Sequence, residues 1–286
     1  MSSRFFTTEA LVIGSMRYRE ADRIVTLYTR DRGRLGAIAK GVRRTSSKVG
    51  GRLEPFSLIR ASLHAGHGLY TVVGVETLRT FQGVRDELFR MEEGARLFAA
   101  VRHLFPGEEG SVPAFNLLVR GIACLADSPD AETAAHTVLA TRLKLLVLLG
   151  YAPEMSRCAV CGGDGAVYGF SPSLGGVVCE ACAMGGAARA GAGAPYGEDA
   201  AGGVGAMHGA GTPDGAGATH GTRTPAPPDV DFVRPASCFA VSPGAVATLR
   251  AFLDRPLAKI ETYDFDERAV AEVEQVLRQT LAYHGH

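Results

Sequence analysis

The second apolar run of the chain reads Asp22-Arg23-Ile24-Val25-Thr26-Leu27-Tyr28-Thr29-Arg30-Asp31-Arg32-Gly33-Arg34. Its β-branched side chains favour a strand, because they fit a pleated surface better than a helix. Asp31-Arg32-Gly33 is typical of a tight turn, and apolar residues resume between Arg34 and Val42. The stretch therefore predicts two consecutive strands joined by a short turn.

Similar runs lie before and after this pair of strands. The predicted strands are Thr8–Arg17, Asp22–Arg30, Arg34–Val42, Phe56–His64 and Leu69–Leu78. One connection is long, from Arg43 to Pro55, and it is polar and basic. Five short strands with no helix between them suit a small closed barrel of the oligonucleotide-binding (OB) type. An SH3-like barrel has a similar strand count and is the competing fold.

Beyond residue 86 the apolar residues recur at helical spacing. Helices are predicted at 87–105, Ala114–Ala126, Ala131–Leu149 and Ser242–Leu253, followed by a last amphipathic helix. Ser242 and Asp266 are the expected N-caps of the last two helices. The expected fold class is therefore α+β, a five-stranded OB-type barrel followed by an all-helical domain.

Four cysteines stand in two pairs, Cys158-Ala159-Val160-Cys161 and Cys179-Glu180-Ala181-Cys182, with seventeen residues between the pairs. Two residues between cysteines let a knuckle turn aim both thiolates at one ion, and this spacing is typical of structural zinc sites. We therefore predict a structural Zn²⁺ ion bound by Cys158, Cys161, Cys179 and Cys182. Segments 166–170 and 176–178 would pair as a hairpin between the knuckles. Two redox-active CxxC pairs or four unrelated thiols are the alternatives.

These patterns divide the chain into five segments. They are an OB-type DNA-binding domain (1–83), a first helical part (84–157), a zinc module (158–182), an insert (183–229) and a C-terminal helical part (230–286). Ala, Gly and Pro make up 31 of the 47 residues of the insert. Such a composition buries too little apolar surface to offset the entropy of ordering, so we expect a flexible loop.

Charge is distributed unevenly, although the net charge of the chain is zero. Residues 1–85 hold fifteen Lys and Arg against six Asp and Glu, a net charge of +9, and the remainder carries −9. A basic N-terminal domain indicates a polyanionic partner. The candidate DNA contacts are the cations of the predicted barrel and its long connection: Arg17, Arg19, Arg23, Arg34, Lys40, Arg43, Arg44, Lys48 and Arg52.

Bulk composition is that of a globular protein, with 46% hydrophobic and 21% charged residues. Cys124 and Cys238 are left over from the two pairs, which favours a reducing compartment rather than a disulfide framework. No apolar run approaches the length needed to span a bilayer. We therefore expect a cytoplasmic protein without membrane contact.

Two stretches go beyond these general patterns. One runs from Glu20 to Arg30 and continues through Gly33-Arg34-Leu35, Gly41-Val42-Arg43-Arg44 and Leu53-Glu54-Pro55-Phe56. The other runs from Leu146 to Pro153 and continues through both cysteine pairs, with Gly169-Phe170-Ser171-Pro172 and Gly175-Gly176-Val177-Val178. In these residues, and in the order of its elements, the chain resembles the bacterial DNA repair and recombination family RecO, in its zinc-containing form.

The resemblance implies an OB fold joined to a helical domain that carries the zinc module. It also implies a non-enzymatic role in recombinational repair by the RecF pathway. Such proteins bind single- and double-stranded DNA and anneal complementary strands. With the partner RecR they help to load RecA onto DNA coated by single-strand binding protein (SSB), so a nucleoid-associated location is expected. The insert is longer than the family needs.

Some alternatives stay open at the level of sequence. Tyr18, Tyr28 and Tyr70 either stack on bases or pack within the barrel. An RNA-binding or ribosome-associated zinc protein fits the same barrel and cysteine patterns. A nucleic-acid-processing enzyme would need a metal site such as the pair Asp264 and Asp266, but capping of the last helix explains Asp266 more simply. No catalytic residues are expected.

Overall fold

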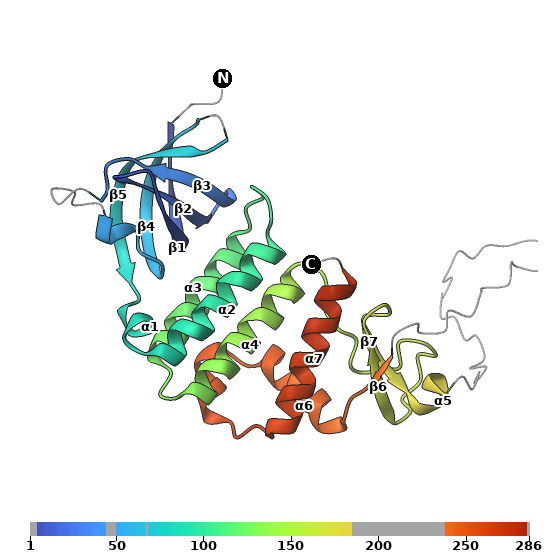
Figure 1. The fold of residues 1–286 in the computed structure, drawn as a ribbon. Coiled ribbons are helices and arrows are strands. Elements are labelled where there is room, and N and C mark those ends of the chain that lie inside the picture. Colours follow the sequence, from blue (N-terminus) through green and yellow to red (C-terminus); the bar gives the residue numbers. More distant parts are fainter. Residues whose placement is uncertain (1–4, 44–49, 67, 185–237, 285–286) are drawn as a thin grey trace, which may run out of the picture.

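The computed structural model describes residues 5–43, 50–66, 68–184 and 238–284. Its parts follow one another in a row, with a β-barrel and a small cysteine-containing module at opposite ends of a helical domain (Figure 1). No helix among the described residues is both long and apolar enough to cross a membrane.

The N-terminal strands form a closed barrel in the order β1-β2-β3-β5-β4, which confirms the predicted OB-type architecture. Neighbouring strands are antiparallel except for β3 and β5, which are parallel. The strands are β1 (Phe5–Tyr18), β2 (Asp22–Thr29), β3 (Gly33–Ala39), β4 (Ser57–His64) and β5 (Tyr70–Thr80). All five were predicted from the sequence, with ends that differ by a few residues.

Alternating side chains fill the interior of the barrel. Val12, Val25, Leu27 and Ile59 are completely buried there. A short 3₁₀ helix that the sequence analysis did not predict, η1 (Gly50–Leu53), adds Leu53 to the same cluster. The long basic connection therefore contributes to the core as well as linking two strands.

The barrel closes weakly between β3 and β5, which pair only through Ala37–Tyr70 and Ile38–Thr71. The loop that follows α2 (Leu88–Leu104) covers the remaining edge of β3. There the Arg34 N–H donates to the Gly107 carbonyl at 3.0 Å. A Cβ at Gly110 would lie 2.1 Å from the Asp31 carbonyl oxygen, so this close approach of two backbones requires glycine.

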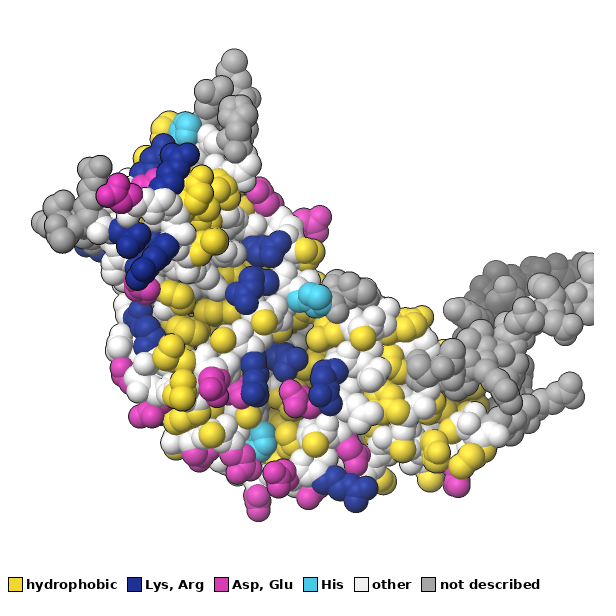
Figure 2. Space-filling model, in the orientation of Figure 1, with side chains coloured by type: hydrophobic (Ala, Val, Ile, Leu, Met, Phe, Trp, Pro, Cys, Tyr) yellow, Lys and Arg dark blue, Asp and Glu magenta, His cyan; other side chains and the backbone are white. Residues whose placement is uncertain are grey.

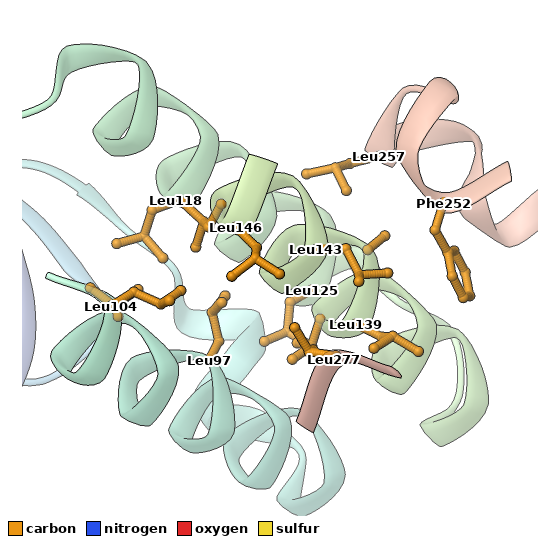
Figure 3. Packing of buried hydrophobic residues seen from close by; sticks show 14 of the residues in the cluster. Leu97, Leu104, Leu118, Leu125, Leu139, Leu143, Leu146, Phe252, Leu257 and Leu277 are labelled. Carbon is orange, nitrogen blue, oxygen red and sulfur yellow. The ribbon is translucent and has the colours of Figure 1, made fainter. Parts of the chain in front are cut away.

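The helical domain comprises α1 (Gln82–Asp86), α2, α3 (Val112–Asp127), α4 (Ala131–Leu148), α6 (Pro243–Asp254), η2 (Leu257–Thr262) and α7 (Glu267–Tyr283). It packs around α4, which is apolar on nearly all sides (Figure 3). Leucines from α2, α3 and α4 meet Phe252 of α6 and Leu277 of α7. The short α1 and η2 were not predicted.

Side-chain caps start four of these helices. The side-chain oxygens of Ser111, Asp130, Ser242 and Asp266 accept backbone N–H groups three residues further on, at 2.7 to 3.3 Å. Each of these bonds satisfies a donor that the first helical turn leaves without a partner. The predicted caps Ser242 and Asp266 are confirmed.

Barrel and helical domain share one apolar cluster. Tyr28 lies with its ring centroid 5.4 Å from that of Phe105, and Phe56 stacks on Phe98 at 4.7 Å. Tyr28 points outward from β2, Phe56 lies in the turn before β4, and both side chains are buried against the helices. The proposed division at residues 83 and 84 therefore cuts through this shared cluster, although the interior of the barrel has an apolar core of its own.

The cysteine module comprises residues 158–183 together with β8 (Phe239–Ala240). The predicted hairpin is present as β6 (Val167–Ser171) and β7 (Gly176–Cys179), and α5 (Glu180–Ala183) follows it. β8 adds a third strand beside β6, which the sequence analysis did not predict. From residue 185 onward, the predicted insert 183–229 lies outside the described residues.

Candidate metal centre and nucleic-acid interface

The four cysteines of the module come together at one point. Their sulfur atoms all lie within 4.8 Å of one another, and the Sγ atoms of Cys161 and Cys179 are 3.9 Å apart. Four sulfurs bound at about 2.3 Å to a tetrahedral ion would be separated by about 3.8 Å. The donor set and its spacing therefore fit one thiophilic metal ion.

Backbone hydrogen bonds shape the first knuckle. The Cys158 N–H donates to the Gly163 carbonyl at 2.9 Å, and the Gly162 N–H donates to the Cys158 carbonyl at 2.8 Å. Gly162 has a φ of +70°, a conformation that favours glycine. The Cys179 N–H of the other knuckle donates to the Cys158 sulfur at 3.4 Å, so the hairpin holds both knuckles in register.

Electrostatics at this point favour a bound cation. Burial opposes ionisation of Cys158, but backbone N–H groups of Cys161, Cys179 and Val160 lower the pKa of its thiol to about 6. Burial, together with hydrogen bonds to the other sulfurs, raises the pKa of Cys182 above its usual value. Four thiols this close cannot all ionise without a positive ion among them.

The centre can hold a metal but offers it no open coordination position, which is typical of a structural site. Cys158, Cys179 and Cys182 are buried, and Cys161 is half-buried. Cys238 packs against the cluster from the start of β8, a proximity that no spacing in the sequence indicated. Among the described residues, no second group of three or more such ligands lies close enough to hold an ion.

Much of the predicted basic set gathers at one end of the barrel, around the β1–β2 hairpin tip (residues 18–22). Arg17 pairs with Arg23 across the hairpin, and Lys40 follows directly after β3. Arg43 binds the tip itself, because its N–H donates to the Ala21 carbonyl and its guanidinium to the Glu20 carbonyl, each at 3.0 Å. The tertiary structure thus brings Arg17, Arg19, Arg23, Lys40 and Arg43 together.

The remaining members of the set lie elsewhere or outside the described residues. Arg34 is about 20 Å from Lys40 along β3, and its guanidinium donates to the carbonyls of Arg102 and Pro106 in the helical domain. Arg52 lies on η1 and donates to the Val75 carbonyl at 2.9 Å. Arg44 and Lys48 fall within 44–49, which is not described.

Most of the predicted DNA-contacting cations that the structure describes form no ion pair, so their charges are available to a polyanion. Among the described members of the set only Arg23 forms an ion pair, with Glu54 at 2.5 Å. The other barrel pairs in the described residues use Arg30 and Arg60, which bind Glu9 and Glu76 on another part of the surface. None of the ion pairs in this part of the chain joins the barrel to the acidic helical domain.

An apolar row crosses the outer surface of three strands beside the tip. Met16 of β1 lies opposite Ile24 of β2, which lies opposite Ile38 of β3. We call Met16, Ile24 and Ile38 the outer strip. Met16 is 62% exposed, and the two isoleucines are half-buried and belong to neither core cluster. The strip could not be found from the sequence, because only the strand register aligns its members.

The three tyrosines have different environments. Tyr28 is completely buried in the barrel–helix junction, so it is not available to stack on a base, and burial raises the pKa of its hydroxyl. Tyr70 packs edge-on against Phe6 and donates to Glu108 at 2.8 Å. Tyr18 is at the hairpin tip and remains 36% exposed.

Basic side chains are not confined to the barrel. On one face of the molecule they continue over the helical domain, whereas acidic side chains gather at the lower edge of that domain (Figure 2).

Asp266 caps α7 with its carboxylate, which accepts the Ala269 backbone N–H at an N···O distance of 2.9 Å. That contact supports the capping interpretation of Asp266 over a magnesium site.

Comparison with known proteins agrees with this architecture. Residues 1–81 match the sequence model of a family described as "Recombination protein O N terminal", and residues 87–194 match "Recombination protein O C terminal". The DNA repair protein RecO of Rubrobacter xylanophilus is 41% identical over 179 residues, which cover 62% of this chain and 71% of that protein. The RecO of Pelotomaculum thermopropionicum is 30% identical over 284 residues, or 98% of this chain and 90% of that protein. This barrel, helical domain and cysteine module therefore belong to a member of the RecO family of DNA repair proteins.

Proposed function

We propose that this chain is a non-enzymatic mediator of recombinational repair in the RecF pathway, which binds DNA and anneals complementary strands. The observation that carries the proposal is the gathering of five cations around the hairpin tip, beside an exposed apolar strip, on an OB-type barrel. Cations track phosphates without reading sequence. Strands held by their backbones keep their base edges available for pairing, which annealing requires.

Salt dependence follows from the number of phosphate contacts. About four to six contacts to a single strand predict that log K falls with log salt at a slope of roughly −3 to −4, at about −0.7 per contact. Annealing of two labelled complementary oligonucleotides should therefore accelerate strongly at low salt and weakly at high salt. Lack of acceleration at low salt would contradict the proposed function.

Matched double variants test the site itself. Arg17→Ala with Lys40→Ala removes two tip cations and should reduce the steepness of the salt slope by about 1.4. Arg30→Ala with Arg60→Ala removes the same charge from side chains that are already paired with Glu9 and Glu76. The second variant should keep the wild-type slope. Equal slopes for both variants would place the DNA elsewhere.

We assign the metal as Zn²⁺ with a structural role, held by Cys158, Cys161, Cys179 and Cys182. Zn²⁺ suits four thiolates because it accepts tetrahedral sulfur coordination and has no redox chemistry of its own. The distance of the cysteine module from the barrel supports a structural role, since the helical domain lies between them (Figure 1). Quantification of bound metal on protein purified without added zinc checks the identity of the ion.

RecR and SSB are the proposed protein partners. We propose that this chain acts with RecR to load RecA onto SSB-coated single-stranded DNA. The proposed location is the cytoplasm, in association with the nucleoid. A groove of about 740 Å³ on the helical domain supports a protein contact there. Leu117, Val147 and Leu148 line it with Arg120 and Lys144. The test is the rate of RecA-dependent ATP hydrolysis on SSB-coated single strands, which this chain should raise only when RecR is present.

A further inference from the structure

The hairpin tip contains an unusual backbone conformation. Arg19 has a φ of +50°, a region that L-residues avoid and glycine adopts readily. Phe56 is the other non-glycine residue with positive φ in the described part of the chain, and there the conformation lets its ring stack on Phe98 in the core. Arg19 is exposed, so burial gives no comparable reason for its conformation.

The conformation of Arg19 places its guanidinium beside an aromatic ring. The Cζ atom lies 5.3 Å from the ring centroid of Tyr18, a cation–π contact between two exposed side chains. A glycine at position 19 would adopt this backbone conformation without strain, but it would have no guanidinium to contact the Tyr18 ring. Packing does not explain the positive φ of this exposed, charged residue, and backbone strain that does not serve packing tends to occur at binding sites.

Tyr18 continues the outer strip. It lies two residues after Met16 on β1, so both side chains are on the outer face of the same strand. The strip then extends from Met16 through Ile24 to Ile38. Lys40, which follows β3, borders this surface, whereas Arg17 lies between Met16 and Tyr18 on β1 and points to the opposite face of the strand. Aromatic and aliphatic side chains in a row with cations at the edge match the alternation of bases and phosphates in a single strand.

We propose that Tyr18, backed by Arg19, is a stacking platform for an unpaired base, and that the outer strip receives the neighbouring bases. This inference rests on the proposed function and adds a preference for single strands. In a duplex the faces of the bases are covered by adjacent base pairs. The Tyr18 ring could therefore stack only on the terminal base pair of a duplex. Stacking on a face also leaves the Watson–Crick edge available, which is compatible with annealing.

The test compares Tyr18→Ala with Tyr168→Ala, because Tyr168 is exposed to the same degree but lies on β6 of the cysteine module. The probes are a single-stranded oligonucleotide that contains 2-aminopurine, whose fluorescence is quenched by stacking, and a duplex of the same length with closed hairpin ends. Tyr18→Ala should bind the single strand about 5- to 150-fold more weakly, which corresponds to the loss of one stacked base. Its affinity for the duplex and its salt slope should stay at the wild-type values.

Tyr18→Phe should restore both affinity and quenching, because the ring rather than the hydroxyl makes the contact. Arg19→Gly should weaken single-strand binding while its thermal midpoint does not fall, since glycine relieves the positive φ. Equal effects of Tyr18→Ala on single strand and duplex, or unchanged 2-aminopurine quenching, would overturn the inference and leave the proposed function intact. A wild-type protein that binds neither probe would overturn both.

Discussion

At the scale of single residues, the junction between barrel and helices depends on one glycine. Gly94 of α2 leaves room for the ring of Phe56, because a Cβ at this position would lie 2.5 Å from the Phe56 Cε1 atom. Two effects of adding a methyl group therefore oppose each other. Helix propensity favours Ala over Gly by about 1 kcal/mol, whereas overpacking a core costs about 1–3 kcal/mol.

We expect overpacking to dominate, because Phe56 is buried and its ring stacks on Phe98, so it has little freedom to move. The net of the two effects is a fall of about 0–2 kcal/mol in the free energy of unfolding for Gly94→Ala, measured by urea denaturation. Gly51→Ala is the matched control, since nothing lies within 4 Å of a Cβ at that position. An increase in stability for Gly94→Ala would mean that the Phe56 ring relocates at little cost.

A buried histidine gives a second prediction at this scale. Burial lowers the pKa of His136, which packs against Phe252 and Phe265, although Glu132 and Asp130 partly oppose the shift. The unfolded chain then binds a proton more readily than the folded one. The ordinary pKa of a histidine side chain is 6.5. Above that pH the neutral His136 makes its full contribution to stability, and this contribution is lost as the pH falls from 6.5 through the lower pKa of the folded state.

His136→Phe should remove this dependence. The difference in unfolding free energy between wild type and variant should move in favour of the variant from pH 7 to pH 5, as measured by denaturation at each pH. Asp130 accepts the Thr133 N–H as the cap of α4 in both proteins, so its contribution cancels in the comparison. A difference that is constant with pH would show that His136 titrates normally in the folded protein.

At the scale of elements, the cysteine module is the part of the molecule with the smallest apolar core. Cys158, Val178, Cys179 and Cys182 form a separate cluster, and three of its four buried members are themselves ligands. The hairpin is anchored separately, because Phe170 and Val177 are buried in the cluster of the helical domain, but the knuckles and the short helix cannot be held by so small a cluster alone. The metal is therefore expected to supply most of the stability of the knuckles.

Removal of one ligand tests that expectation. Cys158→Ser should abolish stoichiometric metal binding and destabilise the protein by several kcal/mol. The loss should be less than the 10–16 kcal/mol typical of isolated zinc modules, because Phe170 and Val177 are buried in the cluster of the helical domain and β8 pairs with β6. Cys124→Ser, a half-buried thiol of α3 outside the site, should retain the metal. Zinc quantification with thermal denaturation measures both. Full metal content in Cys158→Ser would contradict the four-thiolate assignment.

At the scale of the whole molecule, the shared apolar cluster makes barrel and helices one cooperative unit. Separation of the barrel would expose Leu11, Ile13, Tyr28 and Phe56, and would uncover the edge of β3 that the loop at Gly107 now covers. Exposed apolar surface and an open strand edge both promote aggregation.

The full chain should therefore lose barrel and helical structure in one transition. Urea denaturation followed by tyrosine fluorescence and by far-ultraviolet circular dichroism at the helical band should give coincident midpoints. A fragment of residues 1–83 should be less stable than the barrel within the full chain and should aggregate. A soluble fragment with wild-type stability would show that the contacts at Tyr28 and Phe56 contribute little.

Local features of the chain could be predicted from its sequence. Strand positions followed from apolar and β-branched runs, helix starts from Ser242 and Asp266, and the metal centre from two CxxC knuckles. Each of these depends on residues a few positions apart, where the periodicity of the backbone relates sequence directly to geometry. The addition of β8 beside β6 depends on a contact between distant segments and was missed for that reason.

Only the tertiary structure decided which cations share a surface. Arg34 lies on β3 and Lys40 follows directly after that strand, yet one binds carbonyls of the helical domain and the other lies near the hairpin tip. Cross-strand register aligned Met16, Ile24 and Ile38, and docking of the helices buried Tyr28. Charge and hydrophobicity are properties of single residues, but a binding surface depends on which distant residues register and packing bring together.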